Sequence, residues 1–155
     1  MGQVESIFSP GGLLSRASNF EYRPQQLEMA MAVARALARK EHLAVEAGTG
    51  VGKSLAYLIP AILHAVAHRQ KAVVSTHTIN LQEQLTEKDL PMLERILPVR
   101  FAFTMLKGRQ NYLCTRRLRK AMEQADSLFT SPETNELQRI YEWSKKKIGR
   151  ASCRE

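Results

Sequence analysis

Cysteine is scarce in this chain, and long apolar runs are missing from it. Only two of the 155 residues are cysteines, Cys114 and Cys153, too few for a disulfide framework. No apolar run approaches the roughly 18 residues that a membrane span needs. The N-terminus has no basic segment followed by an apolar stretch, so the sequence predicts no secretory signal. We therefore expect an intracellular, cytoplasmic protein without a membrane partner.

The charge is strongly one-sided. The formal net charge is +8, and 44% of the residues are hydrophobic, which is enough to build a core. A length of 155 residues is typical of one domain of ordinary size. The excess of basic residues favours a polyanionic partner such as nucleic acid, although a basic surface can also be merely solvated.

The last nine residues differ from the rest. Residues 147–155 read KIGRASCRE, which is what one reading frame of a widely used sequencing adapter encodes. We interpret this tail, Cys153 included, as translated adapter sequence and leave it out of the fold prediction. A natural basic terminus is the alternative, and the basic bias of the chain survives without the tail.

Residues 47–54 read AGTGVGKS and carry the strongest signal in the chain. They follow the short apolar run 43–45 and precede an apolar helical pattern, the setting that a phosphate-binding loop requires. Glycines let several backbone N–H groups face one anion, and the next helix adds its positive N-terminal end. A glycine-rich turn without a ligand is the alternative. The predicted phosphate contacts are Gly48, Thr49, Gly50, Val51, Gly52, Lys53 and Ser54, with Ser54 also a ligand of Mg²⁺.

Short apolar segments alternate with helical patterns along the chain. This alternation predicts an α/β fold with a parallel sheet and crossover helices, and ligands at the carboxyl ends of the strands. Residues 1–19 show little periodicity and are expected to be a loosely packed lead-in. The expected strands are 42–45, 71–75 and 101–105, and the expected helices are 25–39, 54–68, 89–97, 116–126, 132–143 and one that Thr78 caps.

Two polar stretches flank the loop. Residues 20–26 read FEYRPQQ, and a glutamine amide suits the paired donor and acceptor of an adenine edge. Taken alone, this stretch is equally an ordinary solvated helix start. Residues 75–85 read STHTINLQEQL after the second expected strand, and hydroxyls at a helix N-terminus suit the phosphates of a nucleic-acid backbone. Simple capping by Thr78 is the alternative, and we assign His77 no catalytic role.

Four motifs in order make a family resemblance. RPQQ at 23–26, AGTGVGKS at 47–54, STHTINLQEQL at 75–85 and LKGRQNYLC at 106–114 resemble the DinG family of helicases, bacterial relatives of the XPD group in superfamily two. The resemblance covers about residues 6–146. It implies a truncated, RecA-like first motor domain at residues 20–106, a phosphate-loop NTPase, and the start of an iron–sulfur-type insertion at residues 107–146.

The resemblance also implies roles for single residues. Gln26 would read the adenine of ATP, and Lys53 and Ser54 would act on the triphosphate and Mg²⁺. Cys114 would be the first of four ligands of a [4Fe–4S] cluster in the full-length protein, although a lone cysteine is ordinarily a small buried hydrophobe. The implied partner is single-stranded or forked DNA, bound by a monomer. The DNA contacts would be Thr76, Thr78, Lys107 and Arg109, although a solvated basic turn would also explain the last two.

The chain lacks the acidic box of such motors. It contains only two aspartates, Asp89 and Asp126, and neither ends an apolar segment. ATP hydrolysis in this class needs an acidic residue that holds Mg²⁺ and orients water. We therefore expect a helicase in the full-length protein and no activity in this chain alone. The alternatives are a phosphate-loop regulatory module without helicase activity and a small basic DNA-binding protein without nucleotide chemistry.

Overall fold

The computed structural model describes residues 2–16, 21–108, 111–124 and 131–147. Cys153, Asp126 and nearly all of the suspected adapter tail therefore lie outside the described residues. The chain divides into two compact units, Met1–Phe103 and Thr104–Glu155, and each is described by itself. We call them the first and second unit.

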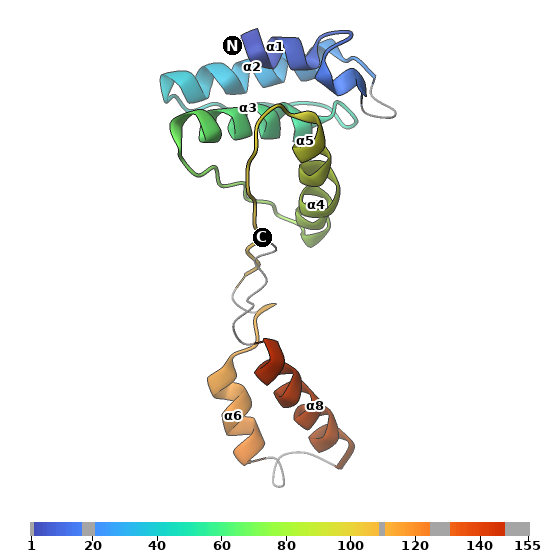
Figure 1. Ribbon diagram of the computed structural model, residues 1–155, viewed down its shortest axis with the longest axis vertical. Coiled ribbons are helices and arrows are strands. Elements are labelled where there is room, and N and C mark those ends of the chain that lie inside the picture. Colours follow the sequence, from blue (N-terminus) through green and yellow to red (C-terminus); the bar gives the residue numbers. More distant parts are fainter. Residues whose placement is uncertain (1, 17–20, 109–110, 125–130, 148–155) are drawn as a thin grey trace. The chain divides into compact units, whose positions relative to one another are not determined.

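The first unit is a stack of helices. Its longest members, α2 and α3, pack along each other, and α1 packs on α2 (Figure 1). η1 is a short 3₁₀ turn and η2 is a single π-helical turn continuous with α4. The elements are α1 (Gly2–Phe8), η1 (Leu13–Arg16), α2 (Pro24–Arg39), α3 (Lys53–His68), α4 (Ile79–Gln84), η2 (Leu85–Asp89) and α5 (Leu90–Ile96).

Local sequence accounts for the ends of α2 and α3. Pro24 occupies the first turn of α2, where its missing N–H has no partner to lose. Lys40 caps the C-terminus of α2 and Arg69 caps that of α3, each in the left-handed conformation that terminates a helix. Pro60 lies inside α3 and is buried there. The predicted helices 25–39 and 54–68 are confirmed within one residue at their ends.

The first residues are not loosely packed, contrary to the sequence-based expectation. α1 is helical, and the side chains of Phe8 and Leu14 are 1% and 0% exposed. They join a core to which α3 contributes Ile59 and α5 contributes Leu93. Glycine and proline at 10–12 misled the prediction, because they form a turn between two core-building segments rather than a flexible lead-in.

The predicted α/β fold is wrong for this structure. In the described residues there is no β-strand, and segments 42–45, 71–75 and 101–105 run without ladder pairing. Val73 is 91% exposed, and Leu43 and Val45 are exposed as well. A parallel strand is stable when it is paired along its edges and covered on both faces, which these segments are not. The described fold is therefore all-helical.

The sequence correctly predicted two helix starts between residues 78 and 91. The Thr78 side chain accepts a hydrogen bond from the backbone N–H of Leu81 at 3.3 Å, the cap expected for α4. Pro91 lies in the first turn of α5, as expected near the start of that helix. The π-helical turn η2 between them was not predicted.

In its described residues, the second unit has the helices α6 (Thr115–Glu123) and α8 (Ser131–Lys147), which pack together. They confirm the helices predicted at 116–126 and 132–143, with shifted ends. Leu118 of α6 is the one buried apolar side chain in the described part of this unit. Of the helices that the structure describes, none combines the length and the apolarity needed to cross a membrane.

Candidate phosphate-binding site

The loop at residues 47–52 joins an extended segment to the start of α3. Gly50 and Gly52 have φ angles of 81° and 79°, values that glycine adopts without a steric penalty. Gly52 is the N-cap residue of α3, so the helix begins where the loop ends. The chain therefore curls tightly at the N-terminal, positive end of α3.

Lys53 folds back over the loop. Its Nζ donates hydrogen bonds to the carbonyl oxygens of Ala47 at 3.0 Å and Gly48 at 2.6 Å. The ammonium group is thus held at the mouth of the turn by two loop carbonyls. An ammonium in this position places a positive charge beside any anion that the loop receives.

The start of α2 also contacts the loop. Arg23, the N-cap residue of α2, donates from Nη1 to the carbonyl oxygen of Gly50, and its Nη2 pairs with Glu21 at 2.9 Å. Gln26 is 4% exposed and donates from Nε2 to the carbonyl oxygen of Gly52 at 2.9 Å. Side chains from α2 therefore hold two further carbonyls of the loop.

These contacts leave the amide side of the loop unengaged. Side chains bind four loop carbonyls, whereas no backbone N–H of residues 48–54 donates a hydrogen bond to another part of the described chain. Backbone N–H groups at a turn and a helix N-terminus are the donors that bind phosphate in proteins. The arrangement is chemically suited to an anion with several acceptor oxygens.

Ser54 lies next to this loop in the first turn of α3. Burial raises the pKa of the nearby Tyr57 phenol above its ordinary value, and the Ser54 side chain lowers that pKa by a smaller amount. The oxygen of a serine hydroxyl carries two lone pairs and can serve as a ligand of a cation. Mg²⁺ takes few protein ligands and shares substrate phosphates, so a single hydroxyl fits it.

Asp89 is an acidic residue that interacts electrostatically with Tyr57 of α3. It belongs to η2, is half-buried, and accepts a hydrogen bond from Gln84 Nε2 at 3.3 Å. Burial raises its pKa above the ordinary value of 3.8, and its charge raises the Tyr57 pKa. Sequence analysis discounted Asp89 because it ends no apolar segment. No signal in the sequence indicated the electrostatic effect of Asp89 on Tyr57.

The residues expected to touch DNA belong to both units, so each group is described by itself. In the first unit Thr76 Oγ1 donates to the carbonyl oxygen of Thr78 at 3.2 Å, and Thr78 caps α4. In the second unit the backbone N–H of Lys107 donates to the Tyr112 hydroxyl at 2.9 Å. Arg109 lies outside the described residues. Capping by Thr78, the simpler alternative, therefore holds, and a DNA contact stays a prediction.

Cys114 is not the buried hydrophobe of the simpler alternative. It is exposed and precedes α6. The backbone N–H of Arg117 lowers the pKa of the thiol most, desolvation opposes it, and the backbone N–H of Arg116 and the charges of both arginines lower the pKa further. No group of three or more metal ligands exists in the described parts of the chain. A [4Fe–4S] cluster needs four thiolates, so the residues described here do not by themselves fit that cofactor.

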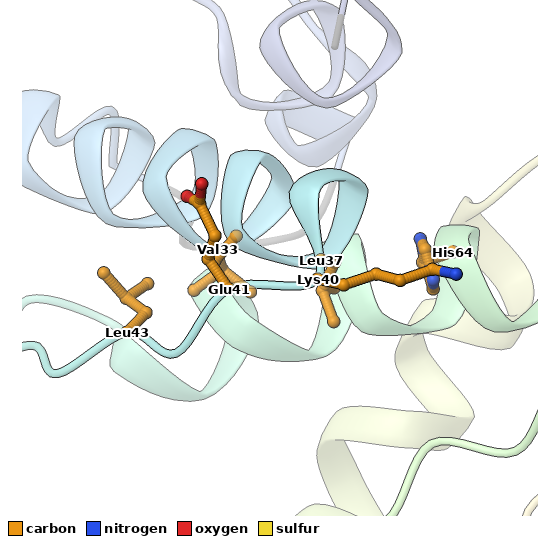
Figure 2. A pocket seen from close by; sticks show the side chains of 7 residues that line it. Val33, Leu37, Lys40, Glu41, Leu43 and His64 are labelled. Carbon is orange, nitrogen blue, oxygen red and sulfur yellow. The ribbon is translucent and has the colours of Figure 1, made fainter.

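A hollow of the first unit lies elsewhere. It has a volume of about 400 Å³ and is formed by the end of α2, the segment after it and the side chain of His64 on α3 (Figure 2). His64 lies 11 residues beyond Lys53, about 16 Å along the helix axis. Burial, His68 and Lys40 lower the His64 pKa. The hollow is therefore separate from the phosphate-binding loop.

Comparison with known proteins agrees with the loop geometry. Residues 24–151 match the model of the DEAD/DEAH box helicase family. The chain is 51% identical over 108 residues to the ATP-dependent helicase DinG of Mycobacterium tuberculosis (strain ATCC 25177 / H37Ra), which covers 67% of this chain and 16% of that protein. It is 41% identical over 143 residues to the ATP-dependent DNA helicase YoaA of Haemophilus influenzae, covering 92% of this chain and 22% of the relative.

A third relative extends the same pattern. The ATP-dependent DNA helicase YoaA of Escherichia coli (strain K12) is 43% identical over 112 residues, covering 72% of this chain and 17% of the relative. The chain thus spans about a sixth to a fifth of the length of these relatives. The resemblance read from the four motifs is confirmed: the chain belongs to the DEAD/DEAH box helicase family, and its named relatives are helicases of the DinG and YoaA type.

Proposed function

We propose that residues 48–54 bind the triphosphate of ATP together with Mg²⁺. Lys53 contacts the β- and γ-phosphates, Ser54 ligates the cation, and the backbone N–H groups of the loop bind phosphate oxygens. One observation carries this proposal. At the start of α3, side chains donate hydrogen bonds to the loop carbonyls, whereas the loop N–H groups donate none to the described chain. In the same proposal Gln26 reads the adenine edge, as the resemblance implies.

For the whole protein, we infer ATP hydrolysis coupled to movement along single-stranded or forked DNA. The names of the relatives support ATP dependence and, for YoaA, a DNA helicase. In hydrolysis, Lys53 and Mg²⁺ stabilise the charge that develops on the transferred phosphoryl group. Thr76, Thr78, Lys107 and Arg109 are the proposed DNA contacts, and the net charge of +8 suits a polyanion.

This chain alone is expected to bind ATP without turning it over. The acidic residue that orients water in this class is not supplied by Asp89, which is bound to Gln84 and partly desolvated. Cluster binding through Cys114, the monomeric state and the cytoplasmic location stay predictions for the full-length protein.

Lys53→Ala tests the proposal directly. We expect ATP affinity to fall about 10- to 100-fold, the equivalent of a hydrogen bond to a charged group. Binding is measured with a fluorescent ATP analogue in the presence of Mg²⁺. Lys71→Ala, which removes an exposed lysine of the same unit, is the matched control and should bind like the parent chain.

Equal affinities of the parent chain and Lys53→Ala would contradict the phosphate site. DNA-stimulated ATP turnover by this chain that vanishes in Lys53→Ala would contradict its expected inactivity. A full-length protein whose ATPase rate ignores single-stranded DNA would favour the regulatory module over the helicase.

A further inference from the structure

The first turn of α2 holds the loop at two alternate peptide groups. Arg23 donates to the carbonyl oxygen of Gly50, and Gln26 Nε2 donates to that of Gly52. Gln26 is buried, although an uncharged side chain of this polarity is rarely buried without a partner. Its partner here is the loop backbone. A residue that only read a base would not need this contact.

The contact between Gln26 and Gly52 is steric as well as polar. A Cβ atom placed on Gly52 would lie 2.1 Å from Gln26 Nε2, far inside van der Waals contact. Gly52 also has a positive φ of 79° and caps α3. A side chain at residue 52 would therefore displace the end of the Gln26 side chain from this contact.

Peptide planarity links these contacts to anion binding. In a trans peptide the C=O and the N–H of the same group point in opposite directions. Fixing the Gly50 carbonyl toward Arg23 therefore turns the N–H of Val51 away from α2, and fixing the Gly52 carbonyl toward Gln26 does the same for the N–H of Lys53. Both amides belong to the set proposed to bind phosphate.

We propose that Arg23 and Gln26 are positioning residues that preorganise the loop amides and so set its affinity for phosphate chains, whatever base is attached. This inference rests on the proposed function, because it concerns how the same loop binds its ligand. It differs from adenine reading in one measurable respect. A base-reading residue affects ATP alone, whereas a loop-holding residue affects every ligand that carries the phosphates.

The test compares three ligands, ATP, GTP and inorganic tripolyphosphate, each with Mg²⁺. We expect Gln26→Ala to weaken tripolyphosphate binding about tenfold, the upper range for one lost hydrogen bond, and GTP and ATP by at least as much. Gln25→Ala is the matched control, since Gln25 is the exposed neighbour of the same type on the same turn. Unchanged tripolyphosphate affinity in Gln26→Ala, measured by titration calorimetry, would overturn the proposal.

Further variants separate positioning from general damage to the fold. Gln26→Glu keeps the size of the side chain but removes the donor, so it should behave like Gln26→Ala. Arg23→Ala should weaken tripolyphosphate binding as well, and Arg23→Lys, which can still donate to the Gly50 carbonyl, should restore most of it. Failure of Arg23→Lys to restore binding, with helix content intact by circular dichroism, would count against the role of Arg23.

A ligand-free measurement distinguishes failure of this inference from failure of the proposed function. The carbonyl ¹³C resonance of Gly52 reports the hydrogen bond that it accepts. It should move upfield in Gln26→Ala and Gln26→Glu and stay in place in Gln25→Ala. If the parent chain binds no phosphate ligand, the proposed function fails. The Gly52 carbonyl shift then still shows whether Gln26 contacts the loop. If the Gly52 carbonyl resonance does not move in the Gln26 variants, the inference loses its structural basis.

The steric contact offers an independent check. Gly52→Ala should displace Gln26 and weaken tripolyphosphate binding. In the double variant Gln26→Ala/Gly52→Ala the clash is gone, so its loss should be smaller than the product of the two single losses. Simple multiplication of the losses would mean that the two residues act independently, against the proposal.

Discussion

The two units of this chain differ in how their helices are held. In the first unit, side chains from α1, η1, α3 and α5 share one buried core, and the loop is tied to α2 and α3 by side-chain hydrogen bonds. In the described part of the second unit, α6 and α8 pack around one buried apolar side chain, Leu118, with the buried Ser144 bonded to the Tyr141 carbonyl. The candidate phosphate-binding loop therefore lies in the unit with the larger core. In that unit many packing contacts remain when one is lost.

The largest effect should come from breaking the core of the first unit. Leu93 is 0% exposed, so Leu93→Ala leaves a cavity and should lower the free energy of unfolding by about 2–5 kcal/mol. Val73→Ala, at a position that is 91% exposed, is the control and should change it by less than about 0.5 kcal/mol. Thermal unfolding followed by circular dichroism measures both. Similar losses in the two variants would show that Leu93 is not a core residue.

A smaller effect is expected from the same change in the second unit. Leu118→Ala should cost about 2 kcal/mol, at the low end of such truncations, because its surroundings include fewer packed side chains. That loss is enough to remove hydrogen-exchange protection from α6 and α8, while protection in α2 and α3 stays unchanged. Arg119→Ala, on the exposed face of α6, is the control. Loss of protection in both units together would mean that they unfold as one.

The smallest effect concerns the half-buried carboxylate of the first unit. Because burial raises the Asp89 pKa, the ionised form is disfavoured in the fold. Solvent screens this partly exposed carboxylate, so Asp89→Asn should stabilise the chain at neutral pH by no more than about 0.5 kcal/mol. The gain is full above the raised pKa and disappears as the pH falls below the ordinary value of 3.8, where both states are protonated. Glu87→Gln, exposed on the same turn, is the control. Destabilisation by Asp89→Asn at pH 7 would show that the charge is needed.

The predictions succeeded where the signal was local. The helices at α2, α3, α6 and α8 follow from apolar spacing and from Pro24, which favours the first helical turn. The capping role of Thr78 likewise needs only residues within one turn. The candidate phosphate-binding loop was likewise predicted from residue types and spacing alone, since its glycines, lysine and serine lie within eight consecutive positions, and phosphate binding by it stays a prediction.

The predictions failed where distant segments had to meet. Apolar runs such as 71–75 resemble strands, but a strand forms only when another segment pairs with it, and periodicity within the run does not say whether one does. The start of the chain was underestimated for the same reason. Phe8 and Leu14 become buried only because α2 and α5 lie against them. The glycines and proline between Phe8 and Leu14 favour a turn and give no sign of these contacts with distant segments.

By itself the sequence determined the helices and the composition of the phosphate loop, because backbone propensity, capping and glycine geometry act between residues that are close along the chain. Only the tertiary structure decided that Arg23 and Gln26, more than 20 positions before the loop, hold its carbonyls, and that the apolar segments remain unpaired. Those outcomes depend on two things: which polar groups distant in the sequence form hydrogen bonds with one another, and which apolar groups bury one another. That choice is made by the packing of the whole unit and not by any stretch of it.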